Sequence, residues 1–281
     1  MGIVITGGSG MLGRTLARRL AGQDALALSS RDLDVGDATA CDRLIAQRRP
    51  RVVVHCAAMT AVDRCESERD AAYRVNALGS ANIAAACARH GARLIAISTD
   101  YVFAGTLARP YHEWDETGAR TVYGASKLSG EEAIRAHCPD HLIARVAWLY
   151  GAGGPSFLHT MLKLGAADGP ALTVVDDQVG NPTSTDAVAD ALLPLLGASL
   201  VGTIHLTCEG EVSWYGFAQA IFARTGLARA LTPCTSAQYP RPAPRPENSR
   251  LEKRVLRLHQ LPPMADWQQA LTRFLKEHPH G

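Results

Sequence analysis

The sequence lacks the features that mark a membrane, secreted or zinc-binding protein. No apolar run approaches the length of a transmembrane helix, and the first ten residues, MGIVITGGSG, contain no cleavage site of a secretory signal. The seven cysteines are scattered, are odd in number and never occur as C-x-x-C. A disulfide framework is therefore not expected, and we predict a cytoplasmic protein whose thiols are reduced and mostly buried.

An excess of charge of either sign is also absent. The chain has 29 lysines and arginines against 27 aspartates and glutamates, which gives a net charge of +2 at pH 7. This balance neither demands nor excludes an anionic partner, so any recognition of an anion has to be local; we predict no nucleic-acid or membrane partner. It leaves the oligomeric state open, and a homodimer is compatible with it.

Short apolar segments alternate with helical segments through the first half of the chain. The segments GIVIT, ALALSS, RVVVHCAA and ARLIAIS have the composition of buried strands, and apolar residues recur at helical spacing between them. This alternation predicts an α/β fold, a Rossmann-like doubly wound parallel sheet with helices on both faces. We predict an NAD(P)-binding domain over residues 1–150, to which later segments return.

The alternation loosens after residue 150, where we predict a smaller C-terminal α/β part, residues 151–281, that mainly binds substrate. Its most distinctive segment is TPCTSAQYPRPAPRPENSRL, residues 232–251, in which prolines recur from Pro233 to Pro246. Proline fixes φ and removes a hydrogen-bond donor, so this segment, called the strap below, should be extended rather than helical.

The segment ITGGSGMLGRTL places Gly7, Gly10 and Gly13 between a strand and a helix. The first glycine allows a tight turn, the second lets the backbone approach a pyrophosphate, and the third lets helix and strand pack closely. The N-terminus of the helix then offers free N–H groups to the anion. We predict that these glycines, with Met11 and Leu12, bind a dinucleotide.

The end of the second strand, LSSRDLDV, bears on the choice of coenzyme. An acid here would bind the ribose 2′-hydroxyl of NADH, whereas an arginine would accommodate the 2′-phosphate of NADPH. The chain offers Ser30 and Arg31 at this point, which favours NADPH and leaves NADH open. Asp34 is expected to hydrogen-bond the adenine and Val35 to contact it.

The third strand ends in HCAAMT, at the edge where a ribose would lie. The small side chains of Ala57 and Ala58 leave room for the sugar, and Thr60 can hydrogen-bond its hydroxyls. His55 stands on a buried apolar strand, where a histidine is more often a core residue than an acid or base.

The segment YGASK places Tyr123 and Lys127 on one face of a helix. A phenol has a pKa near 10, and a nearby ammonium lowers it by stabilising the phenolate. Tyr123 could then protonate a carbonyl oxygen while hydride reaches the carbon. Thr99, at the carboxyl end of the strand ARLIAIS, would hydrogen-bond the same oxygen, so we predict Tyr123, Lys127 and Thr99 as catalytic residues, with the first two also contacting the cofactor.

Together these features resemble the extended short-chain dehydrogenase/reductase superfamily and, within it, the dTDP-4-dehydrorhamnose reductase family. The resemblance covers nearly the whole chain and depends on these segments: GGSGMLG, LDV, AAMTAVDRCE, STDYVFAG, YGASKLSGEE, RVAWLYG, DDQVGNPT and RPENSRL. It implies NAD(P)H-dependent reduction of the 4-keto group of dTDP-4-dehydro-L-rhamnose, the last step of dTDP-L-rhamnose synthesis.

The resemblance also implies a set of substrate-binding residues. They are Thr99, Asp100, Trp148, Gln178, Asn181, Arg245, Asn248 and Ser249. The composition of the strap agrees with this, because the guanidinium groups of Arg241, Arg245 and Arg250 suit the oxygens of a nucleotide diphosphate.

Two alternatives stay open. A reductase of another nucleotide-linked 4-keto-6-deoxy sugar would share the same three catalytic residues. A eukaryotic relative is instead a dinucleotide-binding regulatory subunit of methionine adenosyltransferase, and the intact Thr99, Tyr123 and Lys127 argue against such a role here. Some relatives also bridge their dimer through a metal held by carboxylates; because one of those positions is Thr15 in this chain, we expect no metal.

Overall fold

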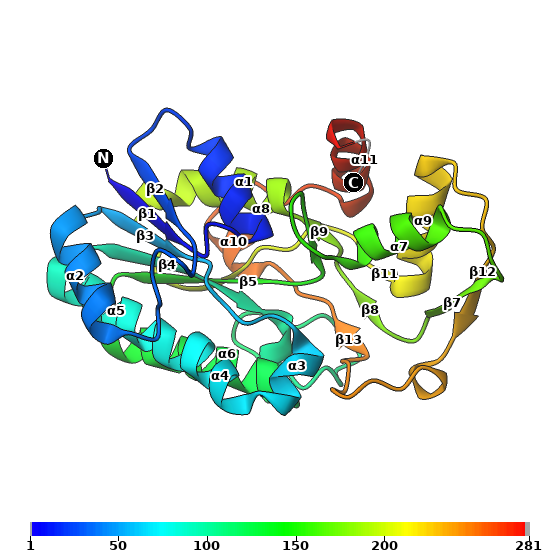
Figure 1. The fold of residues 1–281 in the computed structure, drawn as a ribbon, viewed down its shortest axis with the longest axis horizontal. Coiled ribbons are helices and arrows are strands. Elements are labelled where there is room, and N and C mark those ends of the chain that lie inside the picture. The colour runs from blue at the N-terminus through cyan, green and yellow to red at the C-terminus, as the bar shows by residue number, and fades with distance from the viewer. Residues whose placement is uncertain (1, 279–281) are drawn as a thin grey trace.

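The structure is a computed structural model that describes residues 2–278. Its central sheet has the order β10-β5-β4-β3-β1-β2, and every neighbouring pair is parallel (Figure 1). The strands are β1 Ile3–Thr6, β2 Ala25–Leu28, β3 Val52–His55, β4 Arg93–Thr99, β5 His141–Val146 and β10 Gly202–His205. The predicted Rossmann-like α/β class is confirmed. All the carboxyl ends meet at one edge, and the chain order reverses between β1 and β3, which is where doubly wound folds bind ligands.

Helices cover both faces of this sheet, and alternate strand residues explain why. In β1, Val4 belongs to one apolar cluster while Ile3 and Ile5 belong to the other, as the period of two requires. The cluster of Ile3 and Ile5 includes residues of α1 Met11–Arg19 and α8 Thr185–Leu192, so these helices cover one face. The cluster of Val4 includes residues of α2 Ala38–Arg48, α5 Gly79–His90 and α6 Val122–His137, which cover the other face. Among residues 2–278 no helix is both long and apolar enough to cross a bilayer.

The alanine-rich segment before β4, residues 68–91, is helical as predicted but is not uniform. It consists of α4 Arg69–Tyr73, a π-helical turn over Arg74–Leu78 and α5. Asn76 lies in the π-helical turn and is fully buried. Such turns widen a helix locally and are frequent near functional sites, which makes the environment of Asn76 relevant below.

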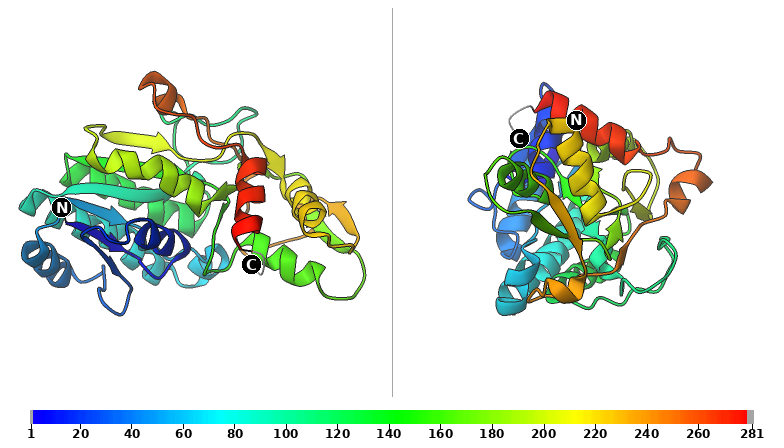
Figure 2. Two further views of the ribbon diagram at one scale, coloured as in Figure 1. Left: turned by 90° about the horizontal axis from the view of Figure 1, so that it is seen from above. Right: turned by 90° about the vertical axis from the view of Figure 1, so that its right-hand side faces the viewer.

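The C-terminal part extends from one end of the sheet, as the two views of Figure 2 show. Its elements are α7 Phe157–Gly165, β7 Leu172–Val175, β8 Val179–Gly180, β11 Val212–Ser213, α9 Trp214–Thr225, β12 Leu231–Cys234, β13 Asn248–Ser249, α10 Arg254–Leu258 and α11 Trp267–Glu277. β10 and α8 return to the central sheet from this half of the chain. The boundary at residue 150 stays a prediction.

Two segments show features that the sequence did not predict. The apolar segment HLIARVAWLY has the composition of a single strand, but it divides into β5 and β6 Leu149–Tyr150, because Trp148 has a φ of 48°, in the left-handed region that interrupts a strand. The strap is extended as expected, but both of its ends pair: β12 lies beside β7, and β13 lies beside β8. The strap is therefore anchored at both ends to the C-terminal sheets.

Candidate active site

A cavity of about 360 Å³ opens at the carboxyl edge of the central sheet. The predicted residues that line it are Gly7, Gly10, Met11, Leu12, Gly13, Ala58, Thr60, Thr99, Asp100, Tyr123, Lys127 and Trp148. They come from the loop after β1, the ends of β3, β4 and β5, and the first turns of α6. Segments far apart in the sequence thus share one wall, as the fold class requires.

The glycine loop at one end of this cavity has no room for side chains. Gly7 has a φ of 67°, and a Cβ on it would lie 2.6 Å from the nitrogen of Ala57. A Cβ on Gly13 would lie 2.3 Å from the oxygen of Gly7. The loop and the first turn of α1 are therefore close-packed and present backbone N–H groups to the cavity, which fits a pyrophosphate.

The three predicted catalytic residues line this same cavity and are held there by neighbouring protein groups. Lys127 Nζ donates a hydrogen bond of 2.8 Å to the carbonyl oxygen of Ile97 in β4, while Thr99 ends the same strand. The Thr99 hydroxyl donates to Asp100 Oδ1 at 3.0 Å. Thr99, Tyr123 and Lys127 are each less than 10 % exposed.

Burial controls the protonation of this group. The sequence predicts that the Lys127 ammonium lowers the pKa of Tyr123, but burial instead raises it above its ordinary value, against the opposing effect of a hydrogen bond with the Thr99 hydroxyl. It also lowers the pKa of Lys127 to about 8, although the negative charge of Glu131 acts in the opposite direction. Tyr123 is consequently a neutral phenol at neutral pH, and Lys127 loses its charge near pH 8.

A buried ion pair behind Lys127 holds α6 against the sheet. Glu131, one turn after Lys127, accepts bonds from Arg145 Nε at 2.9 Å and Arg145 Nη2 at 2.7 Å, and from the Ser98 hydroxyl at 2.5 Å. Burial alone would raise the pKa of Glu131, but these partners hold it well below its ordinary value. The pair joins α6 to both β4 and β5, immediately beside Thr99.

A second support comes from the π-helical turn. The side-chain amide of Asn76 donates to the oxygen of Met59 at 3.1 Å and to the Ser126 hydroxyl at 2.9 Å, and its oxygen accepts from the nitrogen of Met59 at 2.8 Å. Ser126 Oγ in turn donates to the carbonyl oxygen of Tyr123 at 2.8 Å. His55 is buried and hydrogen-bonded to Thr6, and burial lowers its pKa to about 3, so it is a neutral core residue.

The predicted adenosine-binding residues lie outside the lining of this cavity. Ser30 and Arg31 are exposed at the end of β2, and the Arg31 side chain makes no hydrogen bond or ion pair within the part of the chain that the structure describes. Asp34 forms an ion pair with Arg74, and Val35 is buried in the core beneath it. Their contacts with a coenzyme, and those of Ala57, stay predictions.

Most of the predicted substrate residues of the C-terminal part are engaged with protein groups. Asn181 Oδ1 accepts from the nitrogen of Leu251 at 2.8 Å, and Asn248 Nδ2 donates to the oxygens of Leu107 and Arg109, each at 2.7 Å. Gln178 donates a hydrogen bond to Ser236 and accepts one from Trp214, and Arg245 forms an ion pair with Asp63. These side chains hold the strap in place, and their direct contact with substrate stays a prediction.

Asp100 and Ser249 differ from the other predicted substrate residues, because each has one buried side-chain oxygen without a hydrogen-bond partner in the described residues. Neither Asp100 Oδ2 nor Ser249 Oγ makes a hydrogen bond of normal geometry within residues 2–278. Burial raises the pKa of Asp100 to about 6, although Ser249 and Thr99 lie close enough to lower it. Buried oxygens without partners are costly, and a ligand hydroxyl would satisfy them.

Trp148 combines a place in the cavity wall with a fixed orientation. Its ring stacks on Trp214 with 3.4 Å between centroids and an interplanar angle of 6°. A Cβ on Gly180 would lie 2.4 Å from the ring, so this face is also filled. The stack joins the end of β5 to α9 in the C-terminal part.

The structure contains one cluster of metal-ligand type among its described residues. Ligand atoms of Asp186, Glu277 and His278 lie within 4.8 Å of one another. Asp186 already forms an ion pair of 2.6 Å with Arg18, and Thr15 nearby donates only to another hydroxyl, that of Thr185. The absence of a metal stays a prediction.

Several residues around the site were not anticipated from the sequence. Cys56, Val62, Tyr101 and Pro155 line the main cavity, and Glu131 and Asn76 support it. The spacing of Glu131, four residues after Lys127 on the same helix face, was a usable signal. The hydrogen bonds of Asn76 depend on a π-helical turn, and no pattern in the sequence predicted this turn.

Comparison with known proteins agrees with this geometry. The family model described as RmlD substrate binding domain matches residues 1–279. A Mycobacterium tuberculosis protein named dTDP-4-dehydrorhamnose reductase is 45% identical, over 97% of this chain and 92% of its own length. A Streptomyces antibioticus protein named probable dTDP-4,6-dihydroxy-2-methyloxan-3-one 4-ketoreductase is 41% identical, over 95% of this chain and 92% of its own.

A solved structure extends the likeness to three dimensions. The Bacillus anthracis dTDP-4-dehydrorhamnose reductase, crystallised in complex with NADP, superimposes with a TM-score of 0.96 at 35% identity and covers 99% of this chain and 100% of its own. The sequence match and the structural match both run from end to end. The chain belongs to the RmlD substrate binding domain family.

Proposed function

We propose that this chain reduces the 4-keto group of dTDP-4-dehydro-L-rhamnose to give dTDP-L-rhamnose, with NADPH as the hydride donor. One observation carries the proposal: Thr99, Tyr123 and Lys127 line the same cavity as the glycine loop. Relatives that carry the name of this reductase are similar over nearly the whole chain, and one of them binds NADP.

The residues of the cavity fit the coenzyme. The glycine loop would hold its pyrophosphate at the start of α1, and Lys127 and Thr60 would hold ribose hydroxyls. Arg31, exposed and without a partner in the described residues, would meet a 2′-phosphate. NADPH, when bound, supplies the hydride that reaches C4 of the sugar.

The protein's own part in the reaction is the handling of the C4 oxygen. Tyr123, protonated because its site is buried, gives its proton to this oxygen as the C4 carbon is reduced. The ammonium of Lys127, one turn further along α6, stabilises the phenolate that Tyr123 becomes until solvent reprotonates it. Thr99 hydrogen-bonds the same oxygen and orients the carbonyl, while Asp100 and Ser249 would accept and donate to sugar hydroxyls.

A second candidate differs only in the sugar. The Streptomyces antibioticus relative is named for the 4-ketoreduction of another dTDP-linked sugar, so the three catalytic residues are compatible with more than one 4-keto substrate. We expect turnover of a panel of dTDP-linked and GDP-linked 4-keto sugars to separate the candidates. A regulatory role without catalysis predicts no turnover of any member of the panel.

We further propose that the reaction takes place in the cytoplasm. All seven cysteines are free thiols in the structure, and six of them are buried. This usage is typical of a reducing compartment, where disulfides are rare. The proposed partners are the dTDP-sugar and, at the level of assembly, a second copy of the chain.

Tyr123→Phe is expected to lower kcat by about 10²–10⁴-fold, because it removes the proton donor and leaves the ring in place. NADPH oxidation with the keto sugar supplied measures this. The matched control is Tyr73→Phe, an exposed tyrosine on α4, which should retain the wild-type rate. Equal rates for the two variants would show that Tyr123 is not the donor.

The rate is expected to fall as the pH rises above about 8, since Lys127 has a pKa of about 8 and is charged only below it. Tyr123 stays neutral over this range, so the loss of the ammonium is the change that matters. A pH profile of kcat/KM for the keto sugar measures the fall. Lys127→Arg keeps its charge at every pH tested, so its profile, at a lower rate, should be flat there. A fall of the same shape in both proteins would assign it to another group.

Arg31→Ala is expected to weaken NADPH binding by about tenfold and NADH binding by little, because a hydrogen bond to a charged phosphate is worth roughly 1.5–3 kcal/mol. Fluorescence titration of each coenzyme measures both dissociation constants. Arg43→Ala, an exposed arginine on α2, serves as the charge-matched control. Equal weakening of the two coenzymes by Arg31→Ala would reject recognition of the 2′-phosphate.

A further inference from the structure

The short helix α3, Val62–Ser67, lies between the strap and the catalytic helix and carries two acidic residues that the reaction does not use. Asp63 faces the strap. Its Oδ2 accepts from Arg241 Nη2 at 2.6 Å, and its Oδ1 lies 2.9 Å from Arg245 Nη1 and accepts from the nitrogen of Ala243 at 3.2 Å. One carboxylate thus binds two side chains and the backbone of the middle of the strap.

Glu66, three residues later, faces the catalytic helix. Its Oε1 accepts from the nitrogen of Val122 at 2.9 Å, and Val122 is the residue before Tyr123. The hydroxyl of Thr121 accepts from the nitrogen of Gly124 at 3.0 Å. Two of the N–H groups that a helix leaves free at its start are therefore satisfied here, one of them by α3.

Apolar contacts connect the same helix to Tyr123. Cys65 is fully buried in a cluster that contains Val122 and Tyr123, and Val62 and Tyr101 pack against this cluster. The rings of Tyr101 and Tyr123 meet edge to face, with centroids 5.4 Å apart. A displacement of α3 would accordingly change the position of Tyr123, because close-packed interiors transmit small shifts.

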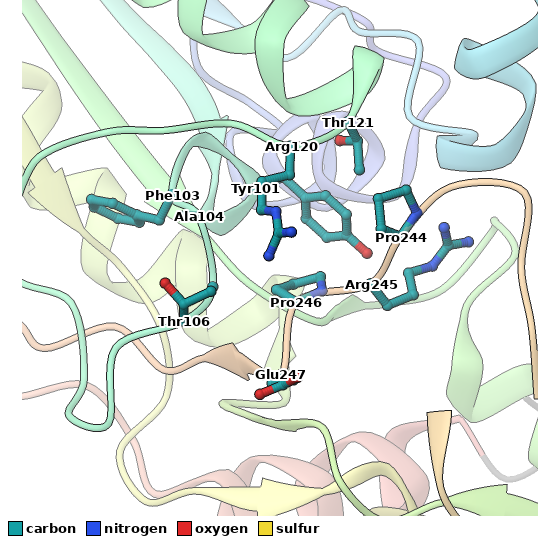
Figure 3. A pocket seen from close by; sticks show the side chains of 11 residues that line it. Tyr101, Phe103, Ala104, Thr106, Arg120, Thr121, Pro244, Arg245, Pro246 and Glu247 are labelled. Atoms are coloured by element: carbon teal, nitrogen blue, oxygen red, sulfur yellow. The ribbon is translucent and has the colours of Figure 1, made fainter. Parts of the chain in front are cut away.

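Tyr101 also reaches the strap. A second, small pocket, of about 50 Å³, lies between the strap and the segment around Tyr101 and Thr121. Figure 3 shows the side chains of Tyr101 and Thr121 facing Pro244 and Pro246 of the strap across this pocket. The strap is therefore connected to the region around Tyr123 in two ways: through the contacts of Asp63 on α3, and across the pocket that it shares with Tyr101 and Thr121.

The charges at Asp63 leave the strap cationic. Burial alone would raise the pKa of Asp63, but bonds from Arg245, Ala243 and Arg241 lower it, so the group is a carboxylate at neutral pH. One carboxylate against two guanidinium groups leaves a net positive charge for an anionic ligand. Both short contacts of Arg245, to Asp63 and to the oxygen of Ala243, use Nη1. The Nε and Nη2 atoms of its guanidinium group therefore remain available for another partner.

We propose that α3 couples the strap to the catalytic tyrosine: Asp63 holds the strap, Glu66 holds the first turn of α6, and a ligand that docks on the strap thereby fixes the position of Tyr123. Asp63 and Glu66 are positioning residues in this account, because neither touches the reacting atoms. The identity of the ligand, an anionic nucleotide-sugar, rests on the function proposed above, whereas the coupling itself does not.

Hydrogen–deuterium exchange of the full-length protein without substrate tests the coupling directly. Asp63→Asn should speed the exchange of strap amides around Ala243 and also of the amides of Val122 and Gly124, each by at least threefold. Glu66→Gln should likewise speed the exchange of the amides of Val122 and Gly124 and also that of the strap amides around Ala243. Asp70→Asn, an exposed aspartate on the neighbouring helix α4, should change neither region. Faster exchange confined to the segment beside each substitution would overturn the proposal.

Steady-state kinetics of the same variants test its consequence. Asp63→Asn should raise KM for the keto sugar about tenfold and also lower kcat, while the dissociation constant of NADPH stays within twofold of wild type. Asp63→Glu, which keeps the charge, should recover part of both losses. A change in KM without any change in kcat would mean that Asp63 serves the strap alone. If the wild-type protein fails to turn over the keto sugar, the proposed function fails, and the exchange experiment still decides the coupling.

Discussion

The hydrogen bond from the buried ammonium of Lys127 to the carbonyl of Ile97 is the contact on which the site depends. A charge can remain inside a protein only with partners, and Lys127 has this carbonyl in front and the charge of Glu131 one turn behind. The bond fixes α6 against the end of β4. Since Thr99 ends that strand and Tyr123 stands one turn before Lys127, it also sets how the phenol and the hydroxyl face each other.

Further contacts hold α6 in place, and they lie at increasing distance from Tyr123 and Lys127. Glu131 joins α6 to β5 through Arg145, and Asn76 joins it to the loop after β3. The helix α3 extends the connection to the strap, which belongs to the C-terminal half of the chain. The predicted catalytic residues and the predicted substrate residues of the strap therefore share one set of contacts, although they are separated by more than a hundred positions in the sequence.

Patterns in the sequence predicted the parts of the site that follow from local rules. The glycine spacing, the Tyr123–Lys127 turn and the position of Thr99 after a buried strand follow from strand, turn and helix geometry, and the structure brings these residues into one cavity. The partners of Asn248 and Arg245 could not be predicted, because they depend on how the strap crosses the other half of the chain. Likewise, the division of the strand at Trp148 follows from its stack on Trp214, a tertiary contact that overrides the local preference for a strand.

The central claim is that one carbonyl oxygen lies between a phenol and a hydroxyl, while its carbon faces a hydride-donating coenzyme. A crystal structure of the protein with NADP and dTDP-L-rhamnose tests it most directly. The account predicts that the O4 atom of the sugar lies within hydrogen-bond distance of both Tyr123 Oη and Thr99 Oγ1, with C4 facing the nicotinamide. A sugar bound with O4 directed away from Tyr123, or a coenzyme seated outside the glycine loop, would contradict it.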